Sequence, residues 1–115
     1  MTDIDQRRPA SMDLLRLGTG FDEDERDRIV EQFRKLDKRL KRWPAETVEM
    51  ELSIKERDTS SQQVTFEVWI HTDGDTHFVT SSKEELLQDA LMDCREDMWR
   101  QIDEFISRKT DGRKR

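Results

Sequence analysis

Residues 82–109 read SKEELLQDALMDCREDMWRQIDEFISRK and carry apolar residues at helical spacing. Ser82, followed by Glu85 three residues later, matches a capping box, so we predict that a long helix begins at Ser82. A helix with one apolar stripe has to bury that stripe against another element. The predicted inward positions are Leu87, Leu91, Cys94, Met98, Ile102 and either Phe105 or Ile106.

A second amphipathic helix is predicted over residues 22–43. Asp22 and Glu25 form another capping-box pattern, and Phe21 occupies the position of a hydrophobic staple. Pro44 disfavours helical geometry at the residue before it, which predicts where the helix ends. Its apolar face comprises Ile29, Phe33, Leu36, Leu40 and Trp43.

Three runs between these helices have the pattern of strands. Residues 47–55 and 63–71 alternate apolar with polar side chains, and Asp73-Gly74-Asp75 predicts a turn into a short strand over residues 76–81. The inward positions of the first two runs are Val48, Met50, Leu52, Ile54, Val64, Phe66, Val68 and Ile70.

A further strand is predicted over residues 12–17, before the turn Gly18-Thr19-Gly20. The helix after that turn is long enough to return the chain parallel to this strand. We therefore predict an α+β fold, a β-α-β-β-β-α two-layer sandwich with two helices packed on one face of a four-stranded sheet.

Composition indicates one charged domain. Of 115 residues, 42% are charged and 32% hydrophobic, and the net charge is -6, but the apolar residues cluster on faces that can pack. We expect a flexible leader over residues 1–11, the domain over residues 12–109 and a basic tail over residues 110–115. The absence of a signal-like or membrane-spanning apolar run, and a single cysteine, favour a cytoplasmic protein that has no membrane partner.

The sequence contains no pattern typical of a catalytic site. It has no phosphate-cradling glycine loop, nucleophile elbow or spaced carboxylate pair, and Cys94 is predicted to be a small core residue. His71 and His77 could bind a metal with Asp73 or Asp75, but this spacing matches no standard site. We expect no catalysis, no cofactor, no metal and no small-molecule substrate.

Several segments between residues 12 and 109 share features with one family. These are the strand that ends in Gly-Thr-Gly, the helix DEDERDRIVEQFRKLDKRLKRW with its basic second half, the strands TVEMELSIKERD and QQVTFEVWI, and Ala90-Leu91 with Arg100-Gln101-Ile102 in the last helix. Together they resemble the ribosome hibernation promoting factors, also called ribosome-associated inhibitors. The resemblance implies a β-α-β-β-β-α fold that binds the small ribosomal subunit in the mRNA and tRNA channel and holds ribosomes idle under stress. It implies a short form, without the C-terminal dimerisation domain of longer members.

The candidate rRNA-binding residues form a basic stretch at the end of the first predicted helix. Cations held in a row by a helix can displace counterions from phosphates. The candidates are Arg34, Lys35, Lys38, Arg39, Lys41 and Arg42, with Arg95 and Arg100 from the last helix. The helix dipole alone also favours this arrangement, because acids from Asp22 to Asp27 occupy the other end. The last helix dilutes any shared basic patch, since its acids outnumber its bases.

Two other interpretations use different surfaces. A double-stranded RNA-binding domain would need lysines at the start of its last helix, where this chain has Lys83-Glu84-Glu85. A protein-interaction module would use Trp69 on the open sheet face to bind a basic partner, with the acids Glu49, Glu51 and Glu67 around it. Partial cover of Trp69 by a loop or a terminus is the simpler expectation.

Overall fold

A four-stranded mixed sheet forms one layer of the molecule. The computed structural model describes residues 8–72 and 74–113. The strands β1 (Leu15–Leu17), β2 (Val48–Lys55), β3 (Gln63–His71) and β4 (Asp75–Ser82) are adjacent in that order. β1 pairs parallel to β2, and the other pairs are antiparallel. The predicted α+β class and strand order are confirmed.

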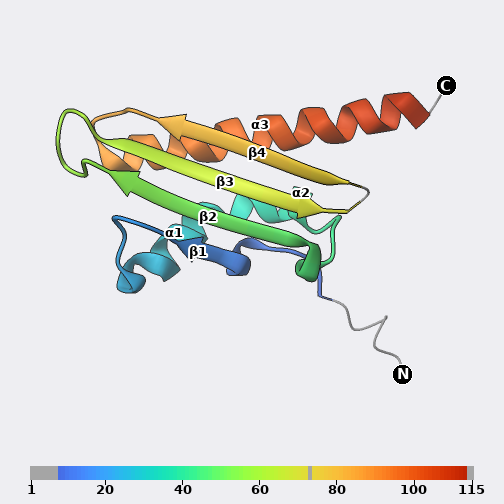
Figure 1. Cartoon of the computed structure of the whole chain (residues 1–115), viewed down its shortest axis with the longest axis horizontal. Coiled ribbons are helices and arrows are strands. Elements are labelled where there is room, and N and C mark those ends of the chain that lie inside the picture. The colour runs from blue at the N-terminus through green and yellow to red at the C-terminus, as the bar shows by residue number, and fades with distance from the viewer. Residues whose placement is uncertain (1–7, 73, 114–115) are drawn as a thin grey trace.

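One face of this sheet is covered by helices. Figure 1 shows α1, α2 and α3 on the same side of the sheet, with the long α3 (Leu87–Arg113) running beside β4. The alternation predicted for β2 and β3 is confirmed, because every predicted inward residue of the two strands is at most 4% exposed. Phe33 meets Phe66 edge to face at 5.2 Å between ring centroids, which joins the helical layer to the sheet.

The first helical segment is broken where one continuous helix over residues 22–43 was predicted. It consists of η3 (Glu23–Glu25), α1 (Arg26–Gln32), η4 (Arg34–Leu36) and α2 (Asp37–Leu40). At the break the Leu36 amide donates to the Phe33 carbonyl at 2.9 Å, a 3-10 bond that places both side chains on the buried side. The Asp37 carboxylate fixes the same point by accepting the Met12 backbone amide at 2.8 Å.

The predicted capping box at Ser82 is wrong, because α3 starts five residues later. Ser82 is the last residue of β4, and its hydroxyl donates to the Asp93 carboxylate at 2.9 Å. The buried side chain of Gln62 donates to the carbonyls of Glu84 and Glu85 at 3.1 Å and holds the segment before the helix in an irregular path. The predicted inward stripe of α3 is confirmed at Leu91, Cys94, Met98 and Ile102, and Ala90 joins it.

The chain before β1 is packed where part of a flexible leader was predicted. Ala10 is fully buried and donates to the Trp43 carbonyl, while the Arg8 carbonyl accepts from the Ala45 amide, both at 2.8 Å. The prediction is therefore wrong for residues 8–11, and residues 1–7 lie outside the described residues. A short helix, η2 (Met12–Leu14), leads into β1, and η5 (Ala45–Thr47) leads into β2.

The turn after β1 agrees with expectation, whereas the C-terminal end of the described chain differs from it. The Gly18-Thr19-Gly20 turn forms as predicted, and Gly20 has a positive φ of 93° beside the Ile54 carbonyl, where a Cβ atom would clash at 2.3 Å. At the other end, α3 continues through residues 110–113 of the predicted tail, and residues 114–115 are outside the described part.

Candidate nucleic-acid interface

The structure separates the eight predicted rRNA-binding residues into paired and unpaired cations. Five of them contact carboxylates of the same chain, and three have no such contact among the described residues. The paired residues are Arg34, Lys35, Arg39, Arg95 and Arg100. The unpaired residues are Lys38, Lys41 and Arg42, all of which are exposed.

Arg34 is the most heavily paired of the candidates. Its guanidinium contacts Asp13 at 2.8 Å and both Glu31 and Asp37 at 3.2 Å. The hydrogen bond to Asp13, followed by those to the other two carboxylates, raises the pKa of Arg34 above its ordinary value. Arg34 therefore ties η2 to the first helical segment, and its charge is already neutralised.

Lys35 and Arg39 face α3, where two acids and a tryptophan meet them. The Lys35 ammonium lies 2.7 and 3.0 Å from the two carboxylate oxygens of Glu96, and Arg39 Nε donates to Asp103 at 3.0 Å. The two cations also lie over the Trp99 ring, at 4.9 and 4.3 Å from its centroid. Hydrogen bonds from Lys35 and then Arg95 hold the pKa of Glu96 below its ordinary value, so Glu96 stays charged at neutral pH.

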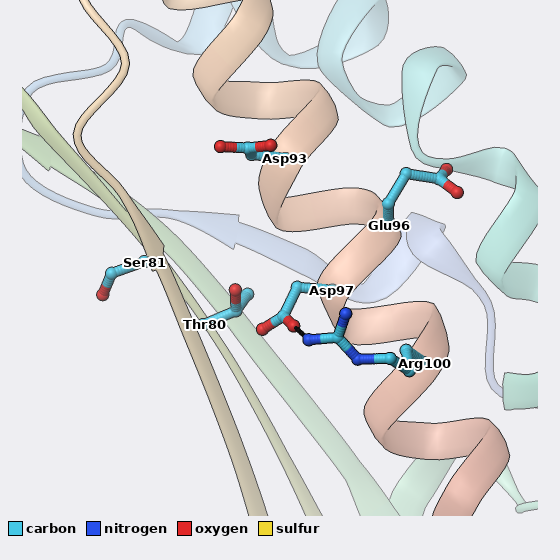
Figure 2. A pocket seen from close by; sticks show the side chains of 6 residues that line it. All are labelled: Thr80, Ser81, Asp93, Glu96, Asp97 and Arg100. Atoms are coloured by element: carbon cyan, nitrogen blue, oxygen red, sulfur yellow. Dashed lines mark hydrogen bonds and ion pairs between the residues drawn. The ribbon is translucent and has the colours of Figure 1, made fainter.

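The two candidates from α3 do not extend the basic surface. Arg95 donates to Glu96 at 2.8 Å and to the Gln32 carbonyl at 3.1 Å, which joins α3 to α1. Arg100 is paired with Asp97 at the side of a polar hollow, which Figure 2 shows between β4 and α3. The lining of that hollow also includes Asp93 and Glu96, so it has three carboxylates and one guanidinium. A phosphate would be repelled from this place.

The unpaired cations gather at one end of the molecule. Lys41 and Arg42 line a shallow hollow of about 220 Å³ together with Trp43 and the exposed Arg8, and Lys38 precedes them by one helical turn. Lys109 of α3 lies over Phe105 at 5.6 Å, and Phe105 contacts the Trp43 ring at 6.4 Å. We call Arg8, Lys38, Lys41, Arg42 and Lys109 the cationic end. None of them forms an ion pair with another described residue.

Arg8 and Lys109 were not among the sequence candidates. Arg8 reaches the cationic end because β1 runs parallel to β2, which brings the residues before the two strands side by side at Pro9 and Pro44. The predicted parallel pairing of these two strands already implied that the residues before them lie close together. No such signal existed for Lys109, whose position depends on where the long α3 passes Trp43.

The open face of the sheet is more crowded than its sequence indicated. His77 of β4 stacks on Trp69 at 4.8 Å, so a neighbouring strand covers the ring where a loop or a terminus was expected. His77 contacts Glu67 at 3.0 Å, and Arg16 contacts Glu49 at 3.1 Å. The Arg16 guanidinium offsets part of the negative charge on the acidic face that a basic partner would use.

The contacts of His71 and Cys94 are those of structural residues. The two ring nitrogens of His71 lie 3.0 Å from Glu49 and 2.9 Å from Asp75, and these carboxylates, Asp75 first, raise the pKa of His71. Among the described residues no cluster of three potential metal ligands occurs, and Asp73 lies outside them. Cys94 is buried in the core as predicted, and burial raises the pKa of its thiol to about 12.

Comparison with known proteins adds no relative. The chain matches no model of a known protein family, and no curated protein gives a significant match. Across the described ranges, none of the helices has both the length and the apolar character that a membrane span requires.

Proposed function

We propose that this protein binds rRNA of the small ribosomal subunit through the cationic end and, by occupying the mRNA and tRNA channel, keeps idle ribosomes from translating. The observation that carries the proposal is the group of unpaired cations around Trp43, supplied by the segment before β1, by the end of the first helical segment and by α3. Phosphate contacts from such cations release counterions and supply sequence-independent affinity. The β-α-β-β-β-α order, which the resemblance to hibernation factors implies, supports the choice of the ribosome as the partner.

The proposed interface is smaller than the eight predicted residues. The five paired candidates are excluded from it, because their carboxylate partners would have to be displaced before a phosphate could bind; they are Arg34, Lys35, Arg39, Arg95 and Arg100. The remaining cations are few, so we expect weak binding, and because the contacts are electrostatic the affinity should fall further as ionic strength rises.

Co-sedimentation with purified small subunits tests the proposal. The variant Lys38→Glu/Lys41→Glu removes two unpaired cations of the cationic end and should weaken binding by about 100-fold at low salt. The matched control is Lys55→Glu/Lys83→Glu, which makes the same change in net charge on two exposed lysines, the last residue of β2 and the first residue after β4. The control should bind nearly as the wild type does.

Two outcomes would contradict the proposal. One is a wild-type protein that does not sediment with small subunits at moderate salt. The other is equal binding by the variant and its control. If binding to a ribosomal component survived the charge reversal and was lost in Trp69→Ala, the open sheet face would be the interface in place of the cationic end.

A further inference from the structure

Two basic residues adjacent to the cationic end are held by acids of α3. Lys35 and Arg39 are one helical turn apart, and Lys38 of the cationic end lies between them in sequence. Their partners Glu96 and Asp103 are about two turns apart on α3, with Trp99 between them. We call Lys35, Arg39 and Trp99 the masked strip.

The geometry of the masked strip suits phosphate. Trp99 supports both cations from below, at 4.9 and 4.3 Å from its ring centroid, so neither cation has to be ordered when a ligand arrives. The guanidinium of Arg39 offers a carboxylate the same donors that it would offer a phosphate. Glu96 and Asp103 therefore occupy the positions where phosphate oxygens would bind.

These ion pairs are also open to exchange. The side chains of Lys35 and Arg39 are 36% and 34% exposed, and those of Glu96 and Asp103 are 49% and 45% exposed. Solvent-exposed pairs of this kind contribute little to stability and weaken further with salt. A competing anion can reach all four groups without unfolding any element.

We propose that Glu96 and Asp103 act as intramolecular competitors of RNA, which keep the masked strip from serving as a second phosphate-binding segment beside the cationic end. This inference rests on the proposed function, since it extends the same RNA-binding surface along the contact between the first helical segment and α3. The acids limit affinity for RNA, and neutralising them adds Lys35 and Arg39 to the interface. Arg95, which also contacts Glu96, is released in part by the same change.

The test is the variant Glu96→Gln/Asp103→Asn, which keeps the shape of both side chains and removes two negative charges. Its affinity is measured over a range of salt concentrations with two probes, purified small subunits and a short hairpin RNA. At low salt we expect binding to tighten by about tenfold, and the slope of log affinity against log salt to steepen by about one to two. Thermal unfolding of the variant should stay close to that of the wild type.

The matched control is Glu23→Gln/Asp24→Asn. It makes the same change in net charge at the start of the first helical segment, where both acids are exposed and contact no described cation. We expect at most about a twofold change in affinity from this general charge effect. Equal gains in the control and the test variant would overturn the inference.

A second variant assigns the gain to the masked strip. Adding Lys35→Gln and Arg39→Gln to Glu96→Gln/Asp103→Asn should return affinity to the wild-type value, and a gain that persists would overturn the inference. If the wild type binds small subunits and the test variant binds them no more tightly, the inference about masking is wrong and the proposed function stands. If the test variant binds hairpin RNA more tightly than the wild type does, but neither protein binds small subunits, the proposed function is wrong and the inference about masking stands.

Discussion

The two halves of the basic stretch are alike in sequence and opposite in structure. Arg34, Lys35 and Arg39 are bonded to carboxylates of the same chain, whereas Lys41 and Arg42, a few residues later, contact none of the described ones. The difference comes from what lies opposite each side chain. Arg34 faces the acids of η2 and of its own segment, and Lys35 and Arg39 face α3. Lys41 and Arg42 line the hollow beside Trp43, where no described lining residue is an acid. A run of cations in sequence therefore does not by itself indicate free positive charge.

The largest expected effect comes from exchanging the same residue type in the two halves. Arg34→Glu should lower the free energy of unfolding by about 2 to 3 kcal/mol, because it places a fourth carboxylate among Asp13, Glu31 and Asp37. Arg42→Glu should change it by no more than about 0.5 kcal/mol while weakening RNA binding. Urea unfolding of both variants measures this, and similar losses of stability would remove the distinction between the two halves.

A smaller effect is expected at Asp37, which anchors the paired half. Asp37→Ala leaves the buried amide of Met12 without its acceptor and Arg34 without one partner, which should cost about 2 kcal/mol. Asp24→Ala is the control, since this exposed acid contacts no described cation, and it should cost about 0.5 kcal/mol or less. Both are measured by urea unfolding. An Asp37→Ala variant as stable as the control would show that the contacts of this carboxylate with Met12 and Arg34 do not stabilise the fold.

The smallest effect concerns acid stability at the end opposite the cationic one. Arg57 donates to Glu25 at 2.6 and 2.9 Å and, with the Asp22 amide, lowers the pKa of Glu25 from 4.5 to about 2. The folded state thus has the lower pKa, so the stabilisation is present above pH 4.5 and is lost as the pH falls toward 2. We expect about 1 kcal/mol, after allowing for solvent screening.

Thermal unfolding of Arg57→Gln across that pH range provides the check. The variant should be less stable than the wild type at neutral pH, and the gap should close as Glu25 becomes protonated. A gap that stays constant with pH would mean that Arg57 acts by packing over Phe21, which lies 5.3 Å from its guanidinium, and not by pairing with Glu25.

The sequence predicted the fold well where a strong periodicity decides the structure. β2 and β3 bury every second residue as expected, since a one-residue slip would turn the whole apolar set toward water. The helix boundaries that were predicted wrongly depend on contacts between residues that are distant in the sequence. Asp37 with Met12 fixes the break in the first helical segment, and Asp93 holds Ser82 in β4 where it would otherwise cap a helix.

The candidate interface could be predicted only in part for the same reason. The residue types and the helical segment were evident, and Lys38, Lys41 and Arg42 stay exposed as the spacing indicated. The pairing of Lys35 with Glu96 joins residues 61 positions apart, and it depends on how two helices rotate about their axes on the sheet. No local pattern carries that information.

The bridge between Pro9 and Pro44 fixes the position of Arg8, the first residue that the structure describes. Arg8 lies beside Lys41 and Arg42 at the hollow next to Trp43, and its carbonyl accepts from the Ala45 amide. An acidic or histidine-rich tag joined directly before Arg8 would place its own charged groups near this surface and change its apparent affinity for RNA. Removing the chain through Ala10 would remove the basic side chain of Arg8 from that surface and the buried methyl group of Ala10 from the core. Protein with an intact N-terminus and protein clipped after Ala10 should therefore differ in their binding of RNA.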